Sequence, residues 1–213
     1  MKNNFYGVVL ILFIVASCSD SVNPVDSGLE NQIYHHGNGS EPQGLDPHIV
    51  TGVPEHHILI SLCEGLTIPN PNQNDMNGYM AGTAESWSIS DDGKEYIFNI
   101  NKNAKWSNGD PVTADDFVWS WKRILTASLG SQYPDMLYYL EGAYEYHNGL
   151  IDDFDLVGVK SIDEHTLQVN LKNPTPFFLG LLSHYSTWPV HKDTVLKFGD
   201  IDDRNGEWTR PGN

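Results

Sequence analysis

The chain of 213 residues is long enough for one or two domains with hydrophobic cores, and a hydrophobic content of 39% is typical of globular proteins. Its 28 acidic and 12 basic residues give a formal net charge of -16. This balance argues against nucleic acid as a partner, because phosphate binding needs a basic surface. An acidic surface favours solubility but identifies no ligand.

The N-terminus has the pattern of an export signal. A short basic start precedes an apolar run from Phe5 to Ala16. About twelve residues match the core of a signal peptide, whereas about 20 are needed to span a bilayer. The run ends at Ala16-Ser17-Cys18, which resembles the bacterial lipobox. We expect residues 1–17 to be a signal peptide and Cys18 to be lipidated, with residues 18–32 as a tether at a membrane surface. The alternative is an ordinary signal peptide with a chance cysteine.

The first predicted element of the folded part is a short helix. Pro54 opens it, and Ile58, Leu59 and Leu62 follow at helical spacing. Cys63 falls in the same apolar stretch, so we expect it to be a small buried side chain.

Two hairpins are predicted further along. Residues 86–101 alternate apolar and polar side chains around the turn Asp91-Asp92-Gly93. Residues 157–160 and 166–172 form the second hairpin around Asp163-Glu164-His165. Both patterns favour antiparallel strands with one buried face.

An amphipathic helix is predicted between the hairpins. Thr113 is the expected N-cap, and Asp116 three residues later gives a weaker form of the capping box. The apolar stripe must pack against the hairpins, giving a layer of helix on sheet. It consists of Phe117, Trp121, Ile124 and Leu125.

The sequence contains no catalytic or phosphate-binding motif of familiar spacing. Acidic pairs such as Asp152-Asp153 suggest a secreted hydrolase, because glycoside hydrolysis uses two carboxylates. These pairs fall in loops, turns and a helix start, where local effects favour aspartate. The doublets His35-His36 and His56-His57 offer imidazole ligands, so a metal site is kept as an alternative.

Several short motifs together resemble one family. They are Leu45-Asp46-Pro47, Cys63-Glu64-Gly65-Leu66, Ala84-Glu85-Ser86-Trp87, Asn103-Ala104-Lys105-Trp106, the run from Gly109 to Phe117 with Trp121, Pro174-Thr175-Pro176-Phe177-Phe178, and the run from Trp208 to Asn213. This pattern is similar to that of the oligopeptide-binding proteins of ABC importers, the family 5 solute-binding proteins. The resemblance extends from about Ile33 to the C-terminus.

The resemblance implies a mixed α/β fold like the N-terminal portion of a type II periplasmic binding protein, with helices packed on antiparallel hairpins. It implies that residues 33–63 begin domain I, 64–182 form the middle domain, and 183–213 start the return to domain I. Family members are usually more than twice this length. We therefore expect an N-terminal fragment that binds peptide weakly or not at all.

The resemblance also implies a function and a site. It implies a monomeric binding protein, not an enzyme, that needs no cofactor and delivers oligopeptides to inner-membrane permease subunits from the periplasmic face. An extended peptide would pair with the backbone of Thr51, Gly52 and Val53, and Tyr133 would lie near the ligand backbone. The alternatives are a nickel or metal-chelate receptor that uses the histidine doublets, a secreted hydrolase, and a purely structural surface lipoprotein.

Overall fold

The computed structural model describes residues 23–72 and 78–210 of the chain. The chain divides into two units, residues 1–39 and residues 40–213. The first unit contains helix α2 (Pro24–Asn31), where the Asn23 side chain accepts a hydrogen bond from the amide of Val25. Part of the predicted tether is therefore helical. The predicted signal peptide and the lipidation site Cys18 lie outside the described residues.

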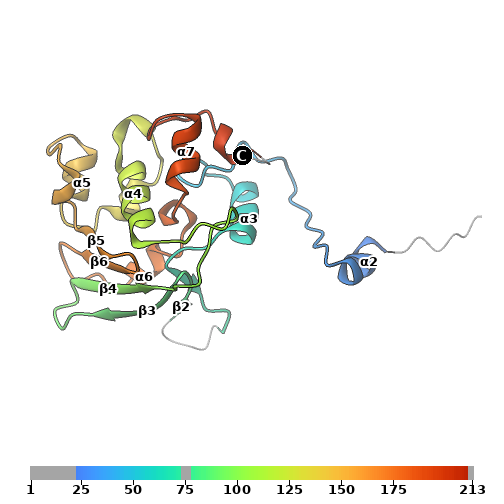
Figure 1. Ribbon diagram of the computed structural model, residues 1–213, viewed down its shortest axis with the longest axis horizontal. Helices are drawn as coiled ribbons and strands as arrows, with labels where there is room; N and C mark the ends of the chain where they lie inside the picture. Colours follow the sequence, from blue (N-terminus) through green and yellow to red (C-terminus); the bar gives the residue numbers. More distant parts are fainter. Residues whose placement is uncertain (1–22, 73–77, 211–213) are drawn as a thin grey trace, which may run out of the picture. The chain divides into compact units, whose positions relative to one another are not determined.

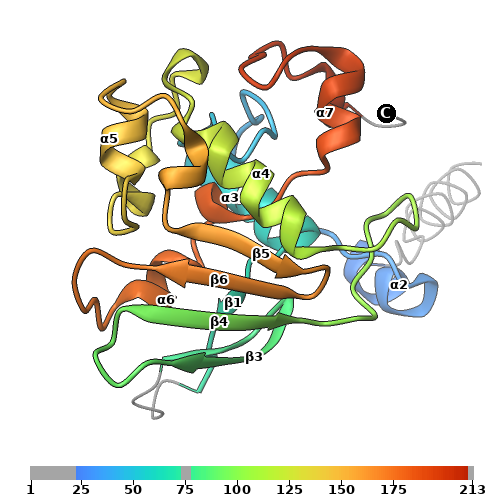
Figure 2. The same cartoon turned by 60° about the vertical axis from the view of Figure 1, so that its left-hand side comes forward.

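The second unit is built on a four-stranded antiparallel sheet with the strand order β3-β4-β6-β5 (Figures 1 and 2). Strands β3 (Ala84–Ile89) and β4 (Glu95–Ile100) form the first predicted hairpin, and Gly93 in its turn has a φ of 69°. Strands β5 (Val159–Asp163) and β6 (Thr166–Asn170) form the second. The central pairing of β4 with β6 joins the hairpins. The structure confirms both predicted hairpins.

A smaller sheet pairs β1 (Thr67–Pro69) with β2 (Tyr79–Ala81). In the larger sheet, alternate residues of the two central strands point into the core, as the pleat of a strand requires. The buried set is Tyr96, Phe98, Ile100, Leu167 and Val169, each at most 3% exposed.

Helix α4 (Ala114–Leu125) lies against this buried face and contacts β5 and β6. Its predicted stripe is completely buried, with Phe117, Trp121, Ile124 and Leu125 all at 0% exposure. The indole nitrogen of Trp121 donates to the carbonyl of Thr187 at 2.9 Å, so this large side chain is buried with its polar atom satisfied. The predicted helix-on-sheet layer is confirmed.

The other helices complete the second unit. Figure 2 shows α4, α5 and α7 above the sheet. Besides α4, the α-helices of this unit are α3 (Val53–Leu62), α5 (Ala143–His147), α6 (Phe178–Leu181) and α7 (Lys192–Phe198). Short 3-10 helices lie at Ala127–Leu129, Pro134–Leu137, Phe154–Leu156, Tyr185–Thr187 and Glu207–Thr209. Among the described residues, no helix is both long enough and apolar enough to cross a membrane.

One expectation about α3 is wrong. The helix forms where predicted, but it ends at Leu62 and leaves Cys63 exposed. As the C-cap of α3, Cys63 has extended backbone angles, and it is exposed to solvent. The apolar spacing suggested burial because Ile58 and Leu59 precede it, yet only Leu59 of these is fully buried.

Candidate ligand-contacting segment

The predicted contact residues lie at the start of α3. Thr51 and Val53 are exposed and Gly52 is half-buried. Gly52 is extended, with φ of -87° and ψ of 156°, and Val53 opens the helix before Pro54. Gly52 is thus extended, and Thr51 precedes it outside any helix or sheet in this structure.

The main-chain groups of this segment are open to new partners. Among the described residues, no hydrogen bond is made by the amide nitrogens of Thr51, Gly52 and Val53 or by the carbonyl oxygen of Thr51. The carbonyl of Gly52 accepts from the amide of His56 in the first turn of α3. An extended segment with exposed donors and an acceptor is the kind of backbone to which another strand can add.

The loop that precedes the segment is anchored by a buried ion pair. Both terminal nitrogens of Arg123 donate to the carboxylate of Asp46, at 2.9 Å and 2.6 Å. Arg123 is fully buried and Asp46 is 4% exposed. One of these nitrogens also donates to the carbonyl of Asp203 at 3.1 Å. Arg123 thus ties the end of α4 both to the loop before Thr51 and to the C-terminal part of the unit.

His48 extends this anchor. Its Nδ1 lies 3.0 Å from the guanidinium of Arg123 and its Nε2 lies 3.0 Å from the carbonyl of Trp188. Because Arg123 can only donate, Nδ1 accepts, and the proton of the neutral ring sits on Nε2. Burial, followed by the nearby charge of Arg123, lowers the pKa of His48 to about 4.

Sequence reasoning missed this cluster. An arginine near the end of a helix is ordinarily explained by the helix dipole, which favours a cation there. The available signal was an arginine immediately before two buried apolar positions, together with the aspartate of Leu45-Asp46-Pro47.

Glu55 braces the segment from the helix side. It is 4% exposed, and its Oε1 accepts from the amide of Gln43 at 2.6 Å. A side chain on Gly52 would displace the Glu55 carboxylate from its present position, and this close approach, not a positive φ, favours glycine there. Thr51 and Glu55 also line a cavity of about 460 Å³, together with Asp46, Arg204 and Thr209.

Tyr133 lies beside the same region. Its ring packs edge-on against His184 and Tyr185, with centroid separations of 5.1 Å and 6.2 Å. The hydroxyl of Tyr185 donates to the carbonyl of Val50 at 3.1 Å. Tyr185 therefore links Tyr133 to Val50, the residue before Thr51, although these residues are distant in sequence.

The alternative metal ligands are divided between the two units of the chain. His35 and His36 belong to the first unit, and His56 and His57 to the second. The rings of His56 and His57 are 6.2 Å apart. Over residues 23–72 and 78–210, no three or more His, Cys, Asp or Glu side chains are placed to hold a metal ion. The geometry gives this alternative no support.

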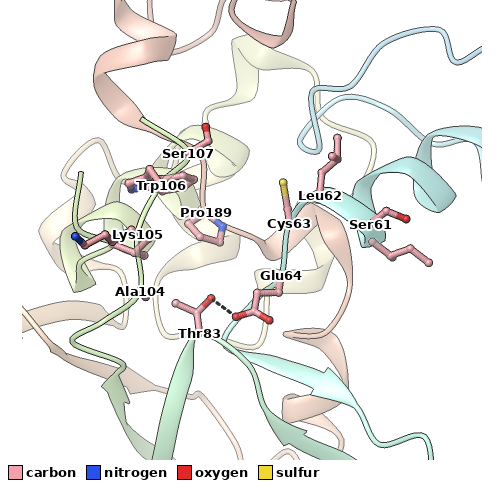
Figure 3. Close-up of a pocket in the computed structure, with 12 residues that line it drawn as sticks. Ser61, Leu62, Cys63, Glu64, Thr83, Ala104, Lys105, Trp106, Ser107 and Pro189 are labelled. Carbon is pink, nitrogen blue, oxygen red and sulfur yellow. Dashed lines mark hydrogen bonds between the residues drawn. The ribbon is translucent and has the colours of Figure 1, made fainter. Parts of the chain in front are cut away.

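A second hollow of about 490 Å³ lies at the other end of α3 (Figure 3). Its walls include Cys63, Trp106 and Pro189, and the hydroxyl of Thr83 donates to Glu64 at 3.3 Å. Lys105 extends away from Glu64 in Figure 3, so its charge does not complete a paired site there. The hollow does not include the predicted contact residues.

The acidic pair proposed for hydrolysis lies on the surface. Asp152 and Asp153 are exposed, and Asp153 caps a 3-10 helix by accepting from the amide of Asp155 at 3.0 Å. The role of Asp153 is therefore local, because its side chain stabilises a turn.

Comparisons with known proteins identify the family of this chain. The sequence profile described as "Bacterial extracellular solute-binding proteins, family 5 Middle" matches residues 78–212. The chain is 46% identical over 187 residues to the periplasmic oligopeptide-binding protein OppA of Escherichia coli (strain K12), covering 86% of this chain and 32% of that protein. It is 38% identical over 224 residues to OppA of Salmonella typhimurium, covering 100% of this chain and 38% of that protein.

Solved structures agree. Haemophilus influenzae OppA in complex with the peptide RPPGFSPFR superposes with a TM-score of 0.70 at 38% identity, covering 77% of this chain and 31% of that chain. The unliganded open form of the murein tripeptide-binding protein MppA gives a TM-score of 0.71 at 35% identity, covering 82% of this chain and 32% of that chain. The chain spans about a third of the length of these relatives.

The fold is therefore part of a type II periplasmic binding protein, a class whose members hold solutes. The chain belongs to family 5 of the bacterial extracellular solute-binding proteins. Proteins of this family bind and do not catalyse, which agrees with the expectation that the chain is not an enzyme.

Proposed function

We propose that this chain forms the peptide-contacting edge of a receptor for an ABC-type peptide importer. The proposed receptor is a monomer, is held at the periplasmic face through lipid on Cys18, and delivers oligopeptides to permease subunits. The names of the relatives support peptide as the ligand class, since several are periplasmic oligopeptide-binding proteins.

The main observation behind this proposal is that backbone groups of Thr51, Gly52 and Val53 make no hydrogen bond within the described residues. Three amide donors and one carbonyl acceptor have no hydrogen-bond partner among the described residues, where the extended Gly52 leads into α3 and where Thr51 and Val53 are exposed. An extended peptide has matching groups at every residue, so main-chain pairing would tolerate many side chains. Water could fill the space around those side chains without large loss of affinity.

The surroundings of the segment suit such a role. The Asp46–Arg123 pair, the Glu55–Gln43 bond and the Tyr185–Val50 bond hold its flanks. A segment held in the bound conformation before the ligand arrives loses little entropy on binding, and this pre-organisation favours affinity. No reactive side chain is needed for this function.

Amide NMR of the ¹⁵N-labelled protein tests the proposal. Titration with trialanine should shift the amide signals of Thr51, Gly52 and Val53. Because the chain spans about a third of its relatives, we expect weak affinity, with Kd on the order of 1 mM.

The control ligand is trialanine methylated at its peptide nitrogens, which keeps its carbonyl acceptors but cannot donate to the carbonyl of Thr51, and whose methyl groups block close main-chain approach. It should give clearly smaller shifts at the segment. Equal shifts with both ligands would contradict main-chain pairing, and shifts confined to the hollow around Glu64 would place the ligand elsewhere.

A further inference from the structure

Tyr185 occupies the junction between the two predicted contact elements. It is 3% exposed, and its hydroxyl donates to the carbonyl of Val50 at 3.1 Å. Its ring meets Tyr133 edge-on at 6.2 Å and is tilted against His56 at 5.6 Å and His184 at 4.3 Å. One buried side chain therefore touches the chain before Thr51, the helix after it, and Tyr133.

We propose that Tyr185 is a positioning residue that holds Tyr133 and the backbone from Val50 to Val53 together as one wall of the peptide site. The proposal rests on the proposed function, because the wall matters only if a peptide pairs with that backbone. Tyr185 itself need not touch the ligand.

Peptide geometry gives the mechanism. The carbonyl of Val50 and the amide of Thr51 belong to the same planar trans peptide unit, so they point in opposite directions. The Tyr185 hydroxyl fixes the carbonyl toward the buried cluster. The Thr51 N–H must then point away from the cluster, and it has no hydrogen-bond acceptor among the described residues. The bond that satisfies a buried hydroxyl thereby aims a ligand donor outward.

The same ring supports Tyr133. The half-buried Tyr133 packs in one cluster with Val50, Leu59, Tyr185 and Trp188. The rings of Tyr185 and His184 restrict its side chain from two sides. Tyr185 thus couples the position of a side chain to the direction of a backbone amide, which no single local element could do.

Tyr185→Phe removes the hydroxyl but keeps the ring, and Tyr96→Phe is its matched control. Tyr96 is also 3% exposed, and its hydroxyl also donates to a main-chain carbonyl, that of Thr175, at 3.5 Å. Tyr185→Phe loses the 3.1 Å bond to Val50 and an interaction with the Tyr133 side chain, so it should lower Tm by about 2–4 °C. Tyr96→Phe loses only a long 3.5 Å bond and should lower Tm by less.

The deciding readouts are the residual dipolar coupling of the Thr51 N–H bond, which reports its direction, and the Kd for trialanine from amide shifts. Tyr185→Phe should change the coupling and weaken binding about threefold to tenfold, whereas Tyr96→Phe should leave both unchanged. Tyr185→Leu removes the ring as well and should also shift the Tyr133 ring signals.

An unchanged Thr51 coupling in Tyr185→Phe would overturn the inference, as would a trialanine Kd equal to that of Tyr96→Phe. If the unmodified protein shows no trialanine shifts at residues 51–53, the proposed function fails instead. The coupling is measured without ligand, so it separates these two failures.

Discussion

The buried ion pair is the residue-scale feature on which the candidate segment depends most directly. Arg123 neutralises Asp46 where both side chains are almost completely buried. Removing one partner of such a pair leaves a buried charge without compensation, which costs about 3–5 kcal/mol. Arg123→Met should therefore lower the free energy of unfolding by that amount in urea titrations. Lys122→Met is the neighbouring control, since Lys122 is exposed, and should cost about 0.5 kcal/mol. Equal losses would show that the pair is not stabilising the fold.

The lowered pKa of His48 predicts that the free energy of unfolding depends on pH. Its pKa is about 4 in the folded chain and about 6.5 when unfolded. Between these values the unfolded chain binds the extra proton, so stability falls as the pH falls. From pH 7 to pH 5 this residue alone should remove about 2 kcal/mol of unfolding free energy.

Urea unfolding of the wild type and His48→Gln at both pH values checks this. The two proteins share every other ionisable group, so the difference between their pH dependences isolates His48. A variant with the wild-type pH dependence would contradict a depressed pKa at this position.

These residue contacts could not be predicted from the sequence because they join positions that are far apart in the chain. Asp46 and Arg123 are 77 residues apart, and Tyr185 is 135 residues from Val50. The apolar positions after Arg123 are a weak local sign of burial, but they do not identify Asp46 as its partner. The predicted contacts at Thr51, Gly52, Val53 and Tyr133 came from family resemblance, and the NMR titrations will test them.

At the scale of elements, the sequence predicted what local periodicity determines. The stripe of α4 and the alternation of both hairpins were clear because each depends on neighbours within a few residues. The pairing of β4 with β6 and the helix α7 were not predicted, since the first is a long-range contact and the second is short. The exposure of Cys63 was misjudged because burial depends on what packs over a helix end.

The start of α4 makes an element-scale prediction. The carboxylate of Asp116 accepts from the amide and hydroxyl of Thr113, at 2.8 Å and 3.1 Å, and from the indole of Trp106 at 3.4 Å. Asp116→Asn weakens these charge-assisted bonds and should cost about 1–2 kcal/mol in urea unfolding.

Asp115→Asn is the matched control, because Asp115 occupies the same first turn but is exposed. It loses only the helix-dipole interaction and should cost about 0.3–0.5 kcal/mol. A larger loss at Asp115 would indicate that the helix dipole, and not the capping box, stabilises this end.

At the scale of the whole molecule, α3 connects the candidate site to surface that is still uncovered. Val53, Ile60 and Leu62 are more than half exposed, while Leu59 on another side of the same helix is 2% exposed. A helix that is apolar on several sides usually packs on several sides. Apolar surface beside the candidate segment is therefore exposed in this chain, which spans about a third of the length of its relatives. For this reason we expect the segment alone to bind weakly.

The net charge of -16 makes a whole-molecule prediction about ligand preference. Main-chain pairing treats all peptides alike, but the negative field of the chain attracts cationic ones. Trilysine should therefore bind more tightly than triglutamate at low salt. Salt shortens the screening length from about 30 Å at 0.01 M to about 3 Å at 1 M, so the preference should shrink toward equality across that range. NMR titrations at several salt concentrations measure the ratio of the two Kd values. A preference that survived about 1 M salt would instead require a direct ionic contact with the ligand side chains.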